Sequence, residues 1–388
     1  MYIRREIEDE ILQGALGFPV LTITGPRQSG KTTLIKHLFP DKNYLSLENP
    51  DNYEIARNDP RGFLNRFQDG VILDEVQRVP ELLSYIQEIV DENNTPGMFI
   101  LSGSQQFNLM SGITQSLAGR TALYKLFPFS ISELGSRNES DIHGILYKGF
   151  YPRIWDMDLS PGKVYSDYFE TYIERDLRQI VNVKDLDKFR RFVRLCAGRV
   201  GQLFIASHLA NELGISVHTI NSWLSILETS YIIFQLPPYY TNINKRLTKS
   251  HKLYFYDIGL ASNLLRIQQP GHLESHPLRG ALFENLVIAD VVKARRHKGM
   301  IDNFYFYRDS NQNEVDLVID DLQTLDAVEI KSSETFNTSL LKGLIHIRKV
   351  LPEIIRKTFL CSAAEQEMTF QEHQLIHFMN ISKTLNNK

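Results

Sequence analysis

The chain is poor in cysteine, and its charge is close to balanced. Its two cysteines, Cys196 and Cys361, are too few for a disulfide framework and match no metal-binding spacing, which predicts buried thiols in a reducing compartment. The formal net charge of −3 excludes a globally basic nucleic-acid binder, although not a local basic patch. Apolar runs are too short to cross a bilayer, and the charged N-terminus lacks the apolar core of a signal peptide. These absences predict a cytoplasmic protein with no membrane partner.

What the chain does contain is a complete phosphate-binding loop. The motif G-x-x-x-x-G-K-T is matched by eight consecutive residues, Gly25, Pro26, Arg27, Gln28, Ser29, Gly30, Lys31 and Thr32. Residues 19–24 resemble a buried strand, and residues 33–39, beginning with Thr33, have helical spacing, which argues against a chance match. In this order of elements, backbone N–H groups and the helix N-terminus face phosphates. We therefore expect a nucleotide here, with Lys31 on its β- and γ-phosphates and Thr32 on Mg²⁺.

Two consecutive acids extend the predicted nucleotide site. Val71, Ile72 and Leu73 have the composition of a buried parallel strand, which ends in Asp74 and Glu75. We expect Asp74 to hold Mg²⁺ through water and Glu75 to polarise the attacking water. An acid pair here is typical of an enzyme that hydrolyses its nucleotide, rather than of a kinase that excludes water. A solvated strand end is the alternative, and the complete loop upstream argues against it.

Three further residues are candidates for the same site. A third apolar strand, residues 98–101, ends at Ser102, and Ser104 follows two positions later. Ligands bind at the carboxyl ends of parallel strands, so either serine could sense the γ-phosphate or position water, although a plain turn explains them equally well. Arg120 could act as an arginine finger in its own site or in a neighbour's, which would require a homo-oligomer. A surface arginine is the simpler interpretation.

Several of these stretches together resemble the AAA-type ATPase domain of a widespread bacterial and archaeal family. The resemblance is carried by the phosphate loop and by residues 72–77, 100–104, 117–121, 127–130 and 149–152. Members of this family join the ATPase to a C-terminal region of unknown function, and the resemblance continues to about residue 335. It implies an AAA-like α/β fold and ATP as the nucleotide. It does not imply a biological role.

The middle of the chain predicts a helix-turn-helix. Residues 201–236 suggest two helices separated by a turn at Gly214, with Ser216 capping the second helix, and then a strand. This order is typical of a winged helix, a fold that often binds DNA. The would-be recognition helix, residues 217–223, has no lysine or arginine to contact phosphates. A basic wing could come from Lys245, Arg246, Lys249 and Lys252. DNA contact therefore competes with a structural or protein-binding role.

Four charged residues in the C-terminal part form another candidate site. Glu284 lies on an apolar helix, Asp316 follows in a strand-like segment, and Glu329 and Lys331 alternate onto one face of the next strand. The acids could hold Mg²⁺, and Lys331 could orient water against a phosphodiester. An acid, a spacer and then Glu-x-Lys resemble the core motif of the restriction-endonuclease-like superfamily. Salt-bridged strand ends, or a nuclease fold without activity, are the alternatives.

A basic run of six residues, 293–298, precedes these strands. It could track a nucleic-acid backbone, but cations also complement the C-terminus of a helix, which is the simpler interpretation.

Together these patterns predict an α/β protein of three parts. They are an AAA-like P-loop NTPase domain with a parallel sheet and helices over residues 1–155, a helical linker with a winged helix over 156–250, and a restriction-endonuclease-like α/β domain over 251–388. One hypothesis is a Mg²⁺-dependent ATPase that controls a C-terminal module acting on nucleic acid. The other is a nucleotide-dependent switch or scaffold that binds a protein partner, with an inactive nuclease-like domain.

Overall fold

The computed structural model describes residues 2–103, 116–137, 141–174, 185–240 and 250–386. The chain divides into two compact units. The first comprises Met1–Phe129, Thr229–Tyr231 and Arg296–Met300, and the second comprises Ser130–Glu228, Ile232–Arg295 and Ile301–Lys388. Among the described residues, no helix is long and apolar enough to cross a membrane.

The sequence predicts that the first domain ends at residue 155, but the first boundary between the two units lies earlier in the chain. The main segment of the first unit ends at Phe129. Directly afterwards, the N–H of Ile131 donates to the buried carboxylate of Asp290 at 2.7 Å, which ties this part of the chain to the second unit. The division into three domains stays a prediction.

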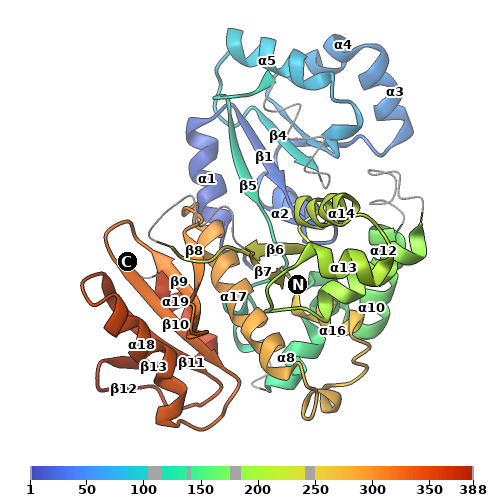
Figure 1. Ribbon diagram of the computed structural model, residues 1–388. Coiled ribbons are helices and arrows are strands. Elements are labelled where there is room, and N and C mark those ends of the chain that lie inside the picture. Colours follow the sequence, from blue (N-terminus) through green and yellow to red (C-terminus); the bar gives the residue numbers. More distant parts are fainter. Residues whose placement is uncertain (1, 104–115, 138–140, 175–184, 241–249, 387–388) are drawn as a thin grey trace. The chain divides into compact units, whose positions relative to one another are not determined.

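The first unit is built on a five-stranded parallel sheet (Figure 1, blue to teal). Its strands are β1 (Val20–Thr24), β2 (Asn43–Ser46), β3 (Val71–Asp74), β4 (Phe99–Gly103) and β5 (Thr121–Lys125). Their order in the sheet is β2-β3-β4-β1-β5, and all neighbours run parallel. The central strands β1, β3 and β4 are buried along their whole length, as a parallel sheet covered on both faces requires. The predicted P-loop NTPase fold is confirmed.

Five helices supply the apolar layers on this sheet. They are α1 (Glu8–Gly17), α2 (Lys31–Leu38), α3 (Pro50–Asn58), α4 (Pro60–Asn65) and α5 (Leu82–Glu92). Alternate residues of the strands face opposite ways. One core therefore joins α1 and α2 to Leu21, Ile23 and their neighbours, and the other joins α3, α4 and α5 to Val20 and theirs.

Two short segments from far along the chain complete the first unit. Tyr231, at the end of the first of them, has a left-handed backbone, and its hydroxyl shares a hydrogen bond of 2.9 Å with the hydroxyl of Thr24. In the second segment, the guanidinium of Arg296 lies 5.7 Å from the centre of the Phe127 ring. Both contacts are made beside residues 24–25 and 127, next to the phosphate loop and the end of β5.

The helices that lie wholly or mainly in the second unit begin directly after its first boundary. They are α7 (Ile131–Leu134), α8 (Ile142–Lys148), α9 (Pro152–Met157), α10 (Pro161–Tyr168), a π-helical segment (Phe169–Glu174), α12 (Leu186–Ala197), α13 (Ala206–Leu213), α14 (Val217–Thr229), α16 (Ile258–Leu264) and α17 (Arg279–His297).

The two helices of the predicted helix-turn-helix are present. Gly214 ends α13 in the left-handed conformation, and the Ser216 hydroxyl caps α14 by accepting from the N–H of Thr219 at 3.0 Å. An antiparallel pair, β6 (Ile233–Leu236) and β7 (Lys252–Phe255), follows. Its connection contains Lys245, Arg246 and Lys249, which lie outside the described residues. The winged-helix assignment stays a prediction.

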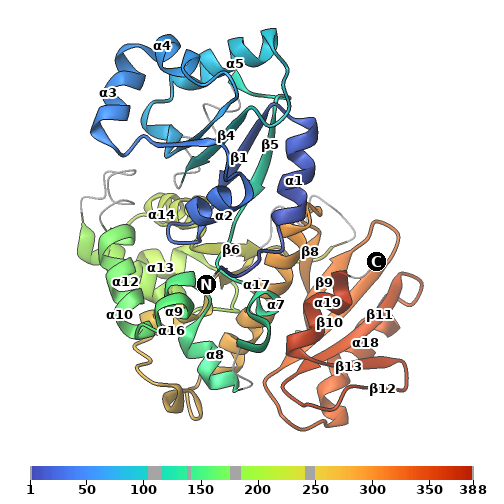
Figure 2. The ribbon, with the colours of Figure 1, turned by 180° about the vertical axis from the view of Figure 1, so that it is seen from behind.

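The C-terminal part of the second unit is a six-stranded mixed sheet. It consists of β8 (Phe304–Arg308), β9 (Glu314–Asp320), β10 (Leu325–Lys331), β11 (Ile355–Ser362), β12 (Met368–Phe370) and β13 (His373–His377). The order is β12-β13-β11-β10-β9-β8, with β10, β11 and β13 parallel and the other pairs antiparallel. Helix α18 (Lys342–Val350) packs on β9, β10 and β11, and α19 (Ile381–Asn386) ends the chain. Figures 1 and 2 show this orange-to-red sheet from opposite sides. The predicted additional α/β domain is confirmed.

Candidate functional site

The phosphate loop connects the end of β1 to the first turn of α2. Its backbone takes positive φ angles at Gly25 (144°), Gln28 (61°) and Gly30 (94°). A side chain at Gly25 would also clash with the carbonyl oxygen of Leu126. The two glycines of the motif are therefore needed for the shape of the loop, independently of any ligand.

Lys31 lies inside the loop and binds the loop itself. Its ammonium group donates to the carbonyl oxygens of Gly25 and Pro26, at 3.0 and 2.9 Å. Burial lowers the pKa of Lys31 from 10.5 to about 8, and the charges of Glu75 and Asp74 oppose this shift. Neutral carbonyls are weaker acceptors for an ammonium than phosphate oxygens. The lysine is therefore positioned to exchange its present acceptors for a phosphate.

Asp74 is the centre of a hydrogen-bond network at the ends of three strands. Its Oδ2 accepts from the hydroxyl of Thr32 at 2.8 Å and from that of Tyr44 at 2.7 Å, and its Oδ1 accepts from Ser102. Strand β4 lies between β1 and β3, and the register sets Ser102 beside Asp74. A hydroxyl and a carboxylate oxygen in direct contact are ligands that Mg²⁺ prefers. Thr32 and Asp74 therefore fit a shared Mg²⁺ ion.

Tyr44 is a member of this network that the sequence analysis missed. It lies on β2, and burial, followed by its hydrogen bond to Asp74, raises the pKa of its phenol. Its only signal in the sequence is a position in a strand that pairs with β3.

Glu75 follows β3 with a left-handed backbone, φ 57°. Its Oε2 accepts a hydrogen bond from the side-chain amide of Gln77, and its charge is the strongest opponent of the lowered Lys31 pKa. Its role in polarising the attacking water stays a prediction.

The other two predicted residues have different outcomes. Ser104 lies outside the described residues. Arg120 precedes β5, and its carbonyl accepts from the N–H of Val20, so it lies where β1 begins. The phosphate loop starts at the other end of β1, about 16 Å away for a five-residue strand. The Arg120 guanidinium pairs with Asp91, at 2.9 Å between Nη2 and Oδ2. Arg120 therefore does not reach the loop of its own chain, while action on a second chain stays a prediction.

The C-terminal acids form two pairs, each bridged by a lysine. The outer pair, Asp316 and Glu329, is bridged by Lys331, whose Nζ lies 3.4 and 2.7 Å from their oxygens. The inner pair, Glu284 and Glu314, is bridged by Lys252 at 3.0 and 2.5 Å. The structure thus brings Asp316, Glu329 and Lys331 together as predicted.

The end of a strand ladder creates the outer pair. Strands β9 and β10 are antiparallel, and the register ends where Val328 pairs with Leu317. Beyond this pair, the N–H of Ile330 on β10 donates to the side-chain carboxylate of Asp316 on β9, at 2.7 Å. The side chain takes the place of a backbone acceptor there, which fixes Asp316 beside the face of β10 that carries Glu329 and Lys331.

The inner pair contains residues that the sequence analysis missed. Lys252 and Tyr254 lie on β7, Glu314 begins β9, and the Tyr254 hydroxyl donates to Glu284 at 2.5 Å. Lys252 is expected from the sequence to belong to a basic wing, but it is 2% exposed. That prediction is wrong for Lys252, because two carboxylates hold its ammonium inside the protein.

In each pair, one carboxyl group has a raised pKa. Burial, together with the charge of Asp316, raises the pKa of Glu329 from 4.5 to about 8 and that of Glu284 to about 7. The second carboxylate oxygen of Glu329, Oε2, is buried and has no hydrogen-bond partner among the described residues. Such an oxygen is available to a cation or to a proton.

The acids do not form a ready-made three-carboxylate metal site. In the part of the chain that the structure describes, Glu284, Asp316 and Glu329 do not offer three ligand atoms within 4.8 Å of one another. Asp316 and Glu329 are brought together by Lys331, which contacts both carboxylates. Glu284 is instead held by Lys252 and Tyr254.

The basic run at the end of α17 is turned inward. Lys293, Arg295 and His297 are 1%, 3% and 0% exposed, and the Lys293 ammonium lies 4.4 Å from the centre of the Phe150 ring. Within 293–298, only Lys298 is exposed. The suggestion that this run follows a nucleic-acid backbone is therefore wrong, because the helix that carries it is buried.

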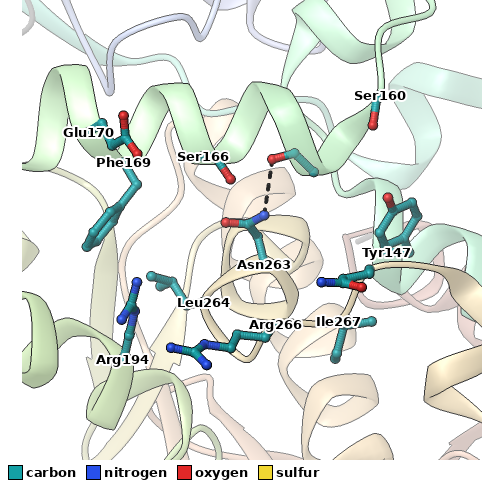
Figure 3. Close-up of a pocket in the computed structure, with 12 residues that line it drawn as sticks. Tyr147, Ser160, Ser166, Phe169, Glu170, Arg194, Asn263, Leu264, Arg266 and Ile267 are labelled. Atoms are coloured by element: carbon teal, nitrogen blue, oxygen red, sulfur yellow. Dashed lines mark hydrogen bonds between the residues drawn. The ribbon is translucent and has the colours of Figure 1, made fainter.

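A separate polar pocket of about 400 Å³ lies in the second unit, between α10, α12 and the turn after α16. Figure 3 shows Arg194 and Arg266 on the same side of it, and Asn263 donating to the carbonyl of Gly162 at 3.3 Å. Neither guanidinium has a hydrogen-bond or ion-pair partner in the described ranges, and Glu170 is the single acid in the lining. This lining suits an anion better than a cation, and no sequence motif marks it.

Three family profiles match successive parts of the chain. The profile described as an AAA domain matches residues 17–135. A domain of unknown function, DUF8612, matches residues 139–271, and a second, DUF4143, matches residues 279–382.

Similar proteins include an uncharacterized protein of Mycobacterium tuberculosis, Rv2008c, which is 30% identical over 352 residues, covering 89% of this chain and 78% of that protein. An uncharacterized protein of Haemophilus influenzae is 26% identical over 62% of this chain and 68% of its own length. Among solved structures, the Walker-type ATPase PABY2304 of Pyrococcus abyssi is 14% identical and covers 68% of this chain and 96% of that one, with a TM-score of 0.47. A TM-score of that size does not transfer a function.

Proposed function

The chain belongs to the family in which an AAA-type P-loop ATPase domain precedes a DUF4143 domain, and from this premise we propose that it binds ATP with Mg²⁺ and hydrolyses it. One observation carries the proposal. Lys31, Thr32, Asp74 and Ser102 come from three different elements and meet at the carboxyl ends of adjacent strands. A salt bridge within the fold does not explain this arrangement, because Lys31 is bound to carbonyl oxygens and Asp74 to hydroxyls.

Each residue then has a distinct part in the reaction. The loop from Gly25 to Thr33, including Arg27, Gln28 and Ser29, surrounds the phosphates, and Lys31 binds the β- and γ-phosphate oxygens. Thr32 and Asp74 hold Mg²⁺, which neutralises phosphate charge when bound. Glu75 accepts the proton of the water that attacks the γ-phosphorus. Ser102 keeps Asp74 oriented by its hydrogen bond.

The test is ATP binding and turnover by the full chain and by Lys31→Ala. We expect phosphate release by the parent in Mg²⁺, abolished by EDTA, and loss of both binding and release in the variant. Lys163→Ala is the control, because Lys163 is exposed, pairs with Asp167 on its own helix and lies in the second unit. A Lys31→Ala protein that releases phosphate at the parent's rate would refute the proposal.

A second function is favoured by the outer acid pair. Asp316, Glu329 and Lys331 converge, and one Glu329 oxygen is buried without a partner among the residues described. We propose that Asp316 and Glu329 hold a divalent cation, which would polarise a phosphodiester of nucleic acid. Lys331 orients the attacking water and stabilises the charge that develops on the phosphate.

The competing proposal is a nucleotide-dependent switch or scaffold for a protein partner. It is supported by the net charge of −3, by the lack of lysine and arginine at residues 217–223, and by the burial of the basic run. Incubation with single- and double-stranded DNA and RNA, with Mg²⁺ or Mn²⁺ and with or without ATP, separates the two. Cleavage that disappears in Lys331→Ala supports the nuclease. Absence of cleavage and of any metal-dependent thermal shift supports the scaffold.

A further inference from the structure

We propose that the acidic site of the second unit takes one divalent cation, at Asp316 and Glu329, and that Lys252 is a built-in positive charge that closes the inner pair, Glu284 and Glu314, to a second cation. The inference rests on the metal-binding role proposed above for the outer pair. It assigns Lys252 as a positioning residue and removes Glu284 from the set of metal ligands.

The two pairs are built alike. Each consists of two carboxylates bridged by one lysine ammonium, with oxygens between 2.5 and 3.4 Å from the nitrogen. The pairs are side by side on β9, since Glu314 and Asp316 are two residues apart and point to the same face. Two acidic pockets of similar construction could each bind an ion, unless something distinguishes them.

Exposure distinguishes the two lysines. The Lys331 side chain is 37% exposed, whereas that of Lys252 is 3% exposed. The Lys331 ammonium can therefore release the two carboxylates when an ion arrives, because it is hydrated beside them, where it can still orient the attacking water. Lys252 begins strand β7, where it pairs with Leu236, and its ammonium also lies 5.5 Å from the centre of the Phe306 ring. An ion at the inner pair would leave a positive charge buried with no partner, which is strongly unfavourable.

The hydrogen bonds and ion pairs of the inner pair also argue against a bound cation there. Glu284 Oε1 accepts from both Lys252 and the Tyr254 hydroxyl, so it already has two donors. Glu314 is bridged to Lys252 and lies 3.6 Å from Arg308. In contrast, Glu329 in the outer pair keeps an oxygen without a donor in the described part of the chain. Among the described residues, the inner pair thus has two cationic partners, Lys252 and Arg308, and a tyrosine donor, whereas the outer pair has one cationic partner, Lys331.

A count of bound Mn²⁺ per chain tests the proposal without measuring activity. Nucleotide-free protein is titrated with Mn²⁺, and free Mn²⁺ is followed by electron paramagnetic resonance. We expect Lys252→Met to bind one more Mn²⁺ than the parent, and Lys252→Met with Glu284→Gln to return to the parent's number. Any ion at the phosphate loop contributes equally to all variants. Lys331→Met is the matched control, and it should bind the same number as the parent.

An isosteric variant keeps the test informative if Lys252→Met does not fold. Glu284→Gln retains an oxygen for Lys252 and Tyr254, so it should fold and bind Mn²⁺ with the parent's number and affinity. Loss of an ion in Glu284→Gln would show that Glu284 is a ligand and would overturn the inference. An unchanged count in folded Lys252→Met would overturn it as well.

The outcome for the outer pair is read separately. A parent whose Mn²⁺ count is not reduced by Glu329→Gln contradicts the metal role proposed for Asp316 and Glu329. An extra ion in Lys252→Met would still support the role of Lys252 in that case. Conversely, an ion lost in Glu329→Gln, with none gained in Lys252→Met, leaves the outer site standing and refutes the inference.

Discussion

The nucleotide site and the acidic site use lysine in opposite ways. In the first unit, the Lys31 ammonium is held by carbonyl oxygens, and Asp74 accepts from three hydroxyls, so among the described residues neither charge has an ion-pair partner. In the second unit, two lysines each bridge two carboxylates. The nucleotide site thus keeps its charges for a ligand, whereas most of the acidic site is neutralised by the protein. A matching motif therefore predicts an open site only where the charges of the motif are not already paired.

The largest effect should come from the water-activating acid of the nucleotide site. We expect Glu75→Gln to lower ATP turnover by roughly 10²–10⁴-fold while ATP still binds, because an amide cannot accept the proton. Phosphate release and equilibrium binding of ATP, measured side by side, check this. Glu81→Gln is the control. Glu81 is exposed and lies directly before α5, so this variant should retain the parent's rate. If Glu75→Gln hydrolyses ATP at the parent's rate, another group must accept the proton of the attacking water.

The second effect concerns the two lysine bridges. Lys252→Met should lower the free energy of unfolding by about 3–5 kcal/mol, because two carboxylates lose their buried partner. Lys331→Met should lower it by about 1 kcal/mol or less, because that lysine is partly exposed. Urea unfolding of metal-free protein measures both. Equal losses for the two variants would remove the distinction between an inner and an outer pair.

A third effect separates the two sites by pH. Glu329 and Glu284 have pKa values raised from 4.5 to about 8 and about 7. Between pH 4.5 and 8 the folded chain therefore retains protons that the unfolded chain has released, so the free energy of unfolding falls as pH rises. Lys31 acts oppositely: its pKa is lowered from 10.5 to about 8, so its contribution to the free energy of unfolding rises between those values.

Urea unfolding at a series of pH values measures these slopes, each at most about 1.4 kcal/mol per pH unit for one group. Glu329→Gln should flatten the slope below pH 8 and leave the slope above it unchanged. Lys31→Met should do the reverse. A slope that neither variant alters would show that other groups determine the pH dependence.

The smallest effect tests the hydroxyls around Asp74. Tyr44→Phe removes one of the three hydroxyl donors and should cost about 1 kcal/mol of stability, with an ATPase rate lowered by less than about tenfold. Tyr53→Phe is the control, because the Tyr53 hydroxyl receives a weak contact from exposed Arg57 at 3.4 Å. A rate that falls as far as in Glu75→Gln would mean that Tyr44 acts on the reaction itself.

The sequence was most informative where function is encoded locally. The phosphate loop and Asp74 could be identified because a strand, a loop and a helix are consecutive, and parallel strands end at a common edge. Lys331 and Glu329 were found for a similar reason, since alternation along one strand sets them on the same face. In each case the relevant neighbours are close in sequence or related by a regular repeat.

Contacts between distant segments were beyond such reasoning. Lys252 looks like one more basic residue in a basic stretch, and only the packing of β7 shows that it faces Glu284 and Glu314. Likewise, charges at 293–298 suggest a surface, but the sequence does not reveal that α17 is buried at that end. Arg120 pairs with Asp91, which lies 29 residues earlier in the chain, and no local pattern in the sequence predicts that contact.

The first unit also contains two segments from later in the chain, Thr229–Tyr231 and Arg296–Met300. They limit how the domains of this protein could have been combined from separate genes. A fragment that ends with the AAA profile at residue 135 lacks the Tyr231 hydroxyl that Thr24 contacts and the Arg296 side chain over Phe127. A gene fusion that joined a finished ATPase to a finished partner would leave each half whole. Here the first unit includes residues from the regions matched by both other profiles, so the parts are expected to be inherited together and to tolerate exchange poorly.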